Sequence, residues 1–94
     1  MLVYKAAYFI DDDGVHVEAL DFPGVNSCGK DIDEARRMIQ SALLDMAEYH
    51  LDAGKALPLP DPTATNPDAD LEEPVYLLLK TASEVEVVPK EATA

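Results

Sequence analysis

The sequence predicts a single α+β domain in the order β-β-β-α-β, in which an antiparallel meander packs on one long helix. Three observations support this fold class: a hairpin signal near the N-terminus, a long stretch of helical spacing in the middle, and a strongly apolar run near the C-terminus. The chain has 94 residues, of which 48% are hydrophobic, so it lies near the lower end of ordinary domain size. We therefore expect one domain over residues 1–94, with a small core that gains support from self-association.

The first two strands are predicted from residue type and alternation. Residues 2–10, LVYKAAYFI, are rich in aromatic and β-branched types, and residues 15–20, VHVEAL, alternate between apolar and polar positions. Between them, the pair Asp13-Gly14 is a strong signal for a two-residue hairpin turn. These features predict an antiparallel hairpin.

A turn and a short third strand are expected next. Pro23 fixes its own φ, and Gly24 adopts positive φ at little cost, so residues 21–24 predict a turn. The segment VNSCG at 25–29 then predicts a strand that continues the meander.

The helix is predicted to cover residues 32–53. Asp31 can cap the free N–H groups of the first turn, and Glu34 can reach back in the aspartate version of a capping box. Gly54 ends the helix, and Pro58 prevents its resumption. The apolar residues at helical spacing are Ala35, Ile39, Ala42, Leu43 and Met46.

A proline-rich acidic connector is predicted over residues 55–74, where five of the seven prolines lie. Because prolines lack ladder donors and favour extended backbone, this segment can carry the chain across one side of the domain or out toward a neighbouring subunit. Residues 75–80 predict an apolar strand, and EVEVV at 84–88 is a candidate for a further strand after a short turn or bulge. Residues 89–94 are expected to be a frayed tail.

The composition is strongly acidic, with 19 Asp and Glu residues against 7 Lys and Arg and a formal net charge of -12. This charge repels phosphates, so neither direct nucleic-acid binding nor membrane binding is expected. It suits a basic protein partner, although acidity also serves solubility alone. The lone Cys28, the lack of a signal-like apolar core before the aspartates at 11–13, and the lack of a bilayer-spanning run favour a cytoplasmic protein.

Chemistry-bearing residues are few and belong to no motif. The aspartates at 11–13 lack the alternate spacing of a calcium loop and are interpreted as a solvated hairpin turn. His16, His50 and Cys28 fit no nucleophile or metal-ligand pattern, so we predict no catalytic residue, no metal and no other cofactor. One enzymatic alternative stays open, in which acidic residues of the small sheet converge to hold Mg²⁺ for phosphoryl chemistry. They are Glu18, Asp21 and Glu34.

The segment that joins the meander to the helix has LDFPGV, then a Gly, then DIDEA, and the helix ends before a proline-rich LPLP. This order of motifs resembles the HicB-like antitoxin family. Members of that family pass from a hairpin through Pro-Asp-Leu-Pro-Gly-Cys to a Gly and a Thr-x-x-Glu-Ala helix start, and their helix also ends before a proline-rich segment. The resemblance covers about residues 3–62. The matching residues are Asp21, Pro23, Gly24, Gly29, Glu34 and Ala35.

The sequence also departs from the family pattern. Many members append a helix-turn-helix or ribbon-helix-helix module, and no helical pattern with basic residues follows Pro60 here, which argues against direct operator binding. Four positions differ in physically tolerable ways: Leu20 stands where Pro is usual, Phe22 where Leu is usual, Val25 for Cys and Asp31 for Thr.

The resemblance implies a non-enzymatic antitoxin, with a fold similar to a truncated RNase H-like fold. It would neutralise a small basic HicA-like toxin that cleaves mRNA, by covering the toxin's RNA-binding and catalytic site. The alternative is a stand-alone oligomeric regulatory or small-ligand binding module of the same fold. A homo-oligomer, dimeric or tetrameric, is expected in both cases. The predicted partner contacts are Glu18, Asp21, Phe22, Asp33 and Glu34. The predicted oligomer contacts are Leu44, Leu51, Tyr76 and Leu78.

Overall fold

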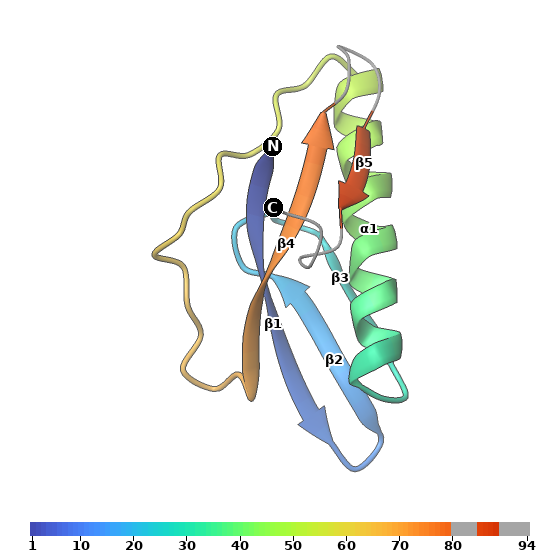
Figure 1. The fold of residues 1–94 in the computed structure, drawn as a ribbon, viewed down its shortest axis with the longest axis vertical. Helices are drawn as coiled ribbons and strands as arrows, with labels where there is room; N and C mark the ends of the chain where they lie inside the picture. The colour runs from blue at the N-terminus through green and yellow to red at the C-terminus, as the bar shows by residue number, and fades with distance from the viewer. Residues whose placement is uncertain (80–84, 89–94) are drawn as a thin grey trace.

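The computed structural model describes residues 1–79 and 85–88. The elements are β1 (Leu2–Asp11), β2 (Gly14–Ala19), β3 (Asn26–Gly29), α1 (Ile32–Asp52), β4 (Leu71–Leu79) and β5 (Val85–Val88). The strands form a sheet in the order β3-β2-β1-β4-β5, with every neighbouring pair antiparallel, and α1 covers one face (Figure 1). The predicted α+β class and β-β-β-α-β order are confirmed. The predicted turn before β5 and the tail at 89–94 lie outside the described residues.

The core lies between α1 and one face of the sheet. Side chains alternate along each strand, so one set of alternate residues points toward the helix. In the sheet these buried residues are Tyr4, Ala6, Tyr8, Val15, Val17, Val75 and Leu77. In the helix they are Ala35, Ile39, Leu43 and Ala47. Ala42 and Met46, predicted from the same spacing, pack at the edge of this core.

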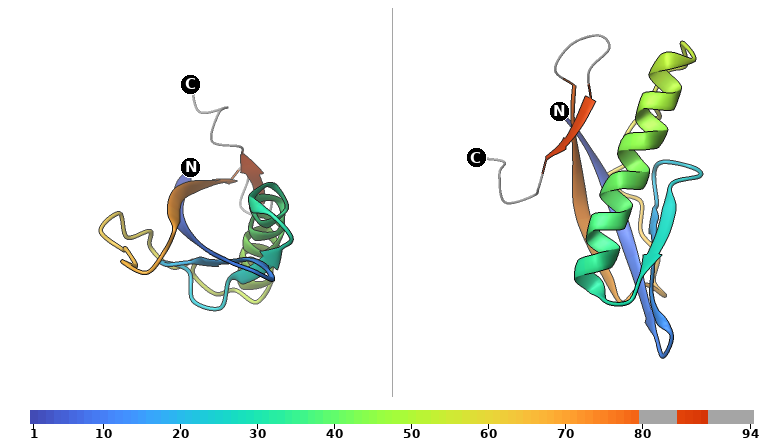
Figure 2. Two further views of the ribbon diagram at one scale, coloured as in Figure 1. Left: turned by 90° about the horizontal axis from the view of Figure 1, so that it is seen from below. Right: turned by 90° about the vertical axis from the view of Figure 1, so that its right-hand side faces the viewer.

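The connector reverses the direction in which the chain re-enters the sheet. α1 begins beside the β1–β2 turn and ends near the start of β1, so a direct connection would place the next strand parallel to β1 (Figure 1). Instead the connector runs back along the side of the sheet away from α1 (Figure 2). As a result β4 pairs antiparallel with β1, with Leu77 opposite Leu2 and Leu71 opposite Tyr8.

The first three strands and the helix lie within one residue of their predicted bounds, and the helix ends at Asp52 with Ala53 as its C-cap. One predicted boundary needs correction. β4 begins at Leu71, inside the segment predicted as connector, so the predicted strand start at residue 75 was wrong. The error came from Pro74, because a proline within a run argues against a strand.

Pro74 is accommodated because its missing N–H lies on an open edge. It is opposite Lys5, whose own N–H and C=O point toward β2 and bond Asp21 and Leu20. At such an antiparallel position both residues direct their main-chain groups away from each other. β5 pairs with β4 only from Tyr76 onward, so no ladder hydrogen bond is lost at Pro74 within the described residues.

Candidate functional site

The carboxylate of Asp21 stabilises the corner, meaning residues 20–25 between β2 and β3, through hydrogen bonds to other parts of the chain. Pairing of β1 with β2 ends where Ala6 lies opposite Ala19, which leaves the N–H of Lys5 without a strand partner on that side. Asp21 Oδ1 accepts that N–H at 2.9 Å, and Oδ2 accepts the main-chain N–H of Asp61 in the connector, also at 2.9 Å. Asp21, predicted as a partner contact, therefore joins β1, the corner and the connector.

Phe22 and Glu18, two further predicted partner contacts, have different surroundings. Phe22 is fully buried, with ring centroids 5.1 Å from Tyr4 and 5.3 Å from His50. Its side chain therefore has no surface to offer a partner, and the sequence did not indicate this because the burial comes from distant residues. Glu18 is half-buried on the outer face of the sheet, meaning the face away from α1, opposite Ala7.

The helix start uses the predicted capping pair. Asp31 Oδ1 accepts the N–H of Glu34 at 2.8 Å, and Glu34 Oε1 accepts the N–H of Lys30, also at 2.8 Å. The glutamate thus bonds the main-chain N–H of Lys30, the residue that precedes the N-cap, and not that of the N-cap itself. Asp33, the other predicted contact here, is exposed and forms an ion pair of 3.2 Å with Arg36.

The predicted partner contacts do not form one surface. β2 runs from the hairpin turn to the corner and β3 runs back, so Asp21 lies at the opposite end of β2 from Glu34. The convergence of these residues with Glu18 that a Mg²⁺ site requires is not seen. Within residues 1–79 and 85–88, no group of three or more His, Cys, Asp or Glu side chains is placed to hold a metal ion.

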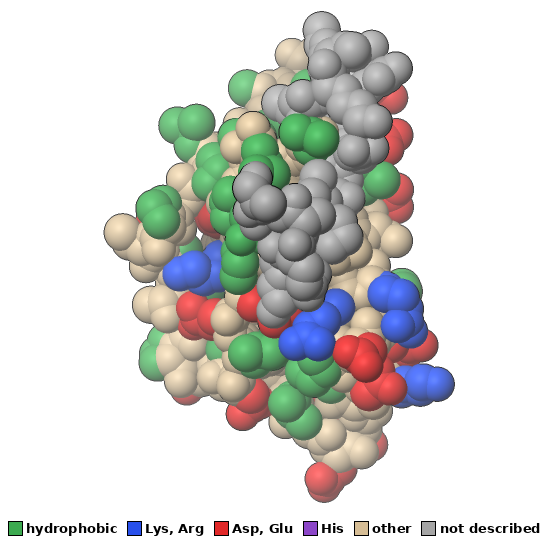
Figure 3. Space-filling model, in the orientation of Figure 1, with side chains coloured by type: hydrophobic (Ala, Val, Ile, Leu, Met, Phe, Trp, Pro, Cys, Tyr) green, Lys and Arg blue, Asp and Glu red, His purple; other side chains and the backbone are tan. Residues whose placement is uncertain are grey.

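Carboxylates gather instead at the hairpin end of the molecule, which sequence reasoning missed. Gly29 of β3 pairs with Val15 of β2, and this brings the helix start beside the β1–β2 turn. A groove of about 350 Å³ lies between them, lined by residues of the turn and of the helix start, and a carboxylate occupies the lower tip in Figure 3. We call this surface the acidic end; its exposed carboxylates are Asp11, Asp12, Asp13, Asp31 and Asp33.

Little positive charge offsets the acidic end. Arg36 pairs with Asp33, and Lys30 lines the groove. The other four carboxylates make no ion pair within the part of the chain that the structure describes. Gly29 allows the close approach, because a Cβ there would lie 2.5 Å from the main-chain nitrogen of Ala35.

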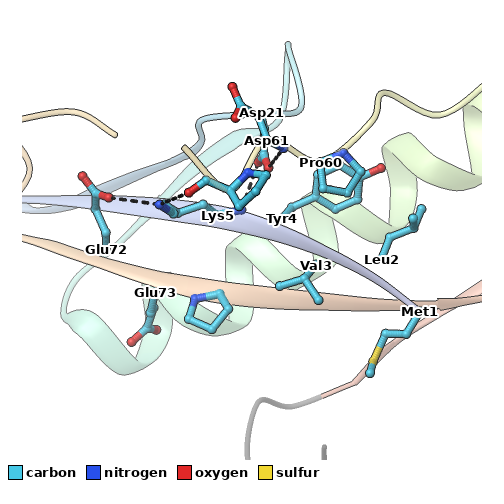
Figure 4. Close-up of a pocket in the computed structure, with 12 residues that line it drawn as sticks. Met1, Leu2, Val3, Tyr4, Lys5, Asp21, Pro60, Asp61, Glu72 and Glu73 are labelled. Atoms are coloured by element: carbon cyan, nitrogen blue, oxygen red, sulfur yellow. Dashed lines mark hydrogen bonds and ion pairs between the residues drawn. The ribbon is translucent and has the colours of Figure 1, made fainter. Parts of the chain in front are cut away.

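A second groove, of about 540 Å³, lies at the start of β1 (Figure 4). β1 and β4 line one side and connector residues 60–62 line the other, and we call it the apolar groove. Tyr76, a predicted oligomer contact, lies opposite Val3 on the same outer face. The apolar lining residues are Met1, Leu2, Val3, Pro60, Pro62 and Pro74.

The carboxylates that line the apolar groove have partners inside the protein. The Lys5 ammonium lies 3.8 Å from Glu72, and a hydrogen bond from the N–H of Asn66 is the main cause that lowers the pKa of Glu72. Hydrogen bonds from Thr63, first from its hydroxyl and then from its N–H, lower the pKa of Asp61. The carboxylate of Asp21 accepts two main-chain N–H groups. The carboxylate of Glu73 forms an ion pair with Arg36.

The sequence matches no family model and no curated protein. The candidate sites therefore depend on geometry, and two surfaces at opposite ends of β1 stand out: the acidic end and the apolar groove. No helix within residues 1–79 and 85–88 is both long enough and apolar enough to cross a membrane.

The two histidines lie in different parts of the fold, and Cys28 lies beside one of them. His50 Nδ1 lies 3.0 Å from the carbonyl oxygen of Met46, and its ring packs edge-on to Phe22, so it contributes to the corner. His16 and the exposed Cys28 are cross-strand neighbours on the outer face.

The predicted oligomer contacts are all half-buried, two on α1 and two on β4: Leu44, Leu51, Tyr76 and Leu78.

Proposed function

We propose that this chain acts as a HicB-like antitoxin in the cytoplasm. It would bind a small basic mRNA-cleaving toxin and neutralise it by covering the toxin's RNA-binding and catalytic site, without any chemistry of its own. The observation that carries the proposal is the acidic end, where the β1–β2 turn and the helix start bring to one surface four carboxylates that make no ion pair with any described residue. Such a surface offers a basic site the charge that RNA phosphates offer.

The geometry of the acidic end suits rapid recognition of a cationic surface. Its carboxylates are exposed, so they keep most of their hydration, and their field extends over about 8 Å at physiological salt. Exposed charges of this kind raise the association rate and exclude wrong partners more than they raise affinity. Of the partner contacts predicted from the sequence, Asp33 belongs to this surface.

The test is a search of the adjacent reading frames for one that encodes a small basic protein, followed by measurement of its association with this chain. Wild-type chain is expected to relieve the growth arrest that this protein causes and to bind it at a rate that falls as salt is raised. The triple variant Asp11→Asn/Asp12→Asn/Asp13→Asn is expected to bind about tenfold more slowly or slower still at low salt. A matched control removes three exposed charges from α1: Asp45→Asn/Glu48→Gln/Asp52→Asn. Equal slowing in both variants, or a rate that does not respond to salt, would contradict the role of the acidic end.

A stand-alone oligomeric regulatory or small-ligand binding module of the same fold is the second candidate. The apolar groove favours it, since a volume of about 540 Å³ lies in the range of small-molecule sites. Absence of an adjacent toxin frame, together with no relief of toxicity on co-expression, would support this candidate over the first.

A further inference from the structure

Leu59 has the most exposed large hydrophobic side chain among the described residues, at 87%. It lies in the connector sequence Leu-Pro-Leu-Pro at 57–60. Leu57 packs against the core, whereas Leu59, two residues further on, points into solvent. Residues two apart share one side of a regular strand, so this segment does not follow the alternation of a strand.

The backbone on both sides of Leu59 is fixed. The hydroxyl of Tyr4 donates to the carbonyl oxygen of Pro58 at 2.6 Å, and the N–H of Asp61 donates to Asp21 Oδ2 at 2.9 Å. The prolines before and after Leu59 restrict φ further. A side chain held in this way loses little conformational entropy when it is covered, which favours its use as a contact.

The apolar groove adjoins this leucine. Pro60, the next residue, lines the groove, and Val3 and Met1 on the opposite side are 42% and 61% exposed. A projecting apolar side chain and an apolar hollow therefore lie next to each other on one surface. This arrangement is self-complementary, as a two-fold symmetric interface requires.

The charge distribution permits two copies to meet here. A chain with a formal net charge of -12 repels a second copy least where cations offset its carboxylates. Of the carboxylates that line the apolar groove, Glu72 pairs with Lys5 and Glu73 pairs with Arg36, so two charges there are offset. At the acidic end, at the other end of β1, four carboxylates make no ion pair with any described residue. A basic partner is drawn toward the acidic end, and a like-charged copy is repelled least at the groove.

We propose that the apolar groove of each chain receives Leu59 of a second copy in a two-fold symmetric dimer. A stable interface covers about 800 Å² on each partner, so the contact extends beyond the groove onto the outer face of β4 at Tyr76. Two oligomer contacts predicted on α1, Leu44 and Leu51, lie outside this surface. The dimer does not depend on toxin binding, so either proposal can fail without the other.

The first experiment measures oligomeric state by sedimentation equilibrium over a range of micromolar concentrations. The wild-type chain is expected to dimerise, and Leu59→Asp is expected to raise the dissociation constant by about tenfold or more. The matched control is Met38→Asp, which places a charge on an apolar side chain of α1 that is 43% exposed. Circular dichroism and thermal unfolding confirm that each variant is folded. A monomeric wild type, or equal weakening by both variants, overturns the proposal.

The second experiment maps the contact. A photoreactive p-benzoylphenylalanine in place of Leu59 is activated in a mixture of ¹⁴N- and ¹⁵N-labelled chains, so that links between copies are distinguished by mass. Links from one copy to residues 1–3 or 60–62 of the other are expected. Links within one copy, or links between copies that cluster on α1, would overturn the proposed geometry.

Discussion

The hydroxyl of Tyr4 in β1 donates a hydrogen bond of 2.6 Å to the main-chain carbonyl oxygen of Pro58, from which 54 sequence positions separate it. The Tyr4 ring is buried against Phe22, while its hydroxyl reaches the connector. Burial, with a smaller contribution from the charge of Asp21, raises the pKa of this hydroxyl from 10.0 to about 12. One side chain thus joins the core to the segment that presents Leu59.

Replacement of Tyr4 by Phe tests this link. The variant keeps the ring but leaves the Pro58 carbonyl without its donor, so the free energy of unfolding should fall by about 1 kcal/mol. Tyr49→Phe, at an exposed position on α1, should change it by about 0.5 kcal/mol or less. Urea denaturation followed by circular dichroism measures both. If the two variants are equally stable, the hydrogen bond contributes nothing measurable.

Alkaline pH should destabilise the fold through its buried tyrosines. The pKa of Tyr4 is raised to about 12, and that of Tyr8 is raised further, mainly by burial and also by the charge of Glu73. Because both pKa values are higher in the folded chain, the unfolded chain releases these protons first. Their contribution is therefore fully present below about pH 10 and is lost as the pH rises toward 12 and above.

Urea denaturation at a series of pH values across that window measures the effect. The slope of unfolding free energy against pH should be shallower in Tyr4→Phe than in wild type, whereas Tyr49→Phe should keep the wild-type slope. Identical slopes in wild type and Tyr4→Phe would rule out a raised pKa at Tyr4.

Asp21→Asn should separate a structural role at the corner from a partner contact. The carboxylate accepts one N–H on each oxygen, from Lys5 and from Asp61. In asparagine an NH₂ group replaces one oxygen, so one of these two N–H groups would face another donor and lose its acceptor. The free energy of unfolding should fall by about 1–3 kcal/mol. Asp68→Asn, an exposed change in the connector, serves as control. An Asp21→Asn variant as stable as this control would contradict the structural role.

Gly29 and Gly54 should respond differently to alanine. At Gly29 a Cβ would meet the main-chain nitrogen of Ala35 at 2.5 Å, so β3 or the helix start must shift, at a cost of about 1–3 kcal/mol. At Gly54 φ is +71° and no atom lies within 4 Å, so the cost is backbone strain alone, about 1 kcal/mol. Thermal unfolding should show the larger decrease in melting temperature for Gly29→Ala. The opposite order would argue against close packing of the helix start.

Elements with strong local signals could be predicted from the sequence. The Asp13-Gly14 turn, the Asp31 cap and the spacing of Ile39 and Leu43 each act within a few residues, so the first hairpin and the helix lie where expected. The start of β4 could not be predicted in this way. Whether Pro74 interrupts a strand depends on which edge its nitrogen faces, and that is set by pairing with β1 across the fold.

The candidate surfaces were harder to predict, because they are made by residues distant in sequence. The acidic end could have been inferred, since a three-stranded meander returns Gly29 to the level of the first turn and so places Asp31 near Asp12. The burial of Phe22 and the apolar groove depend on the path of the connector, which no local pattern specifies.

Because β4 pairs with β1 but follows α1 in the chain, β1 is synthesised long before one of its two neighbouring strands. Residues 2–54 hold the hairpin, the third strand and the helix, whereas residues 71–77 supply the neighbour on the other side of β1. While those later residues are still in the ribosome, one edge of β1 is bare, with main-chain donors and acceptors open to other chains. The nascent protein is therefore exposed to mispairing from the emergence of β1 until the emergence of β4, which closes that interval.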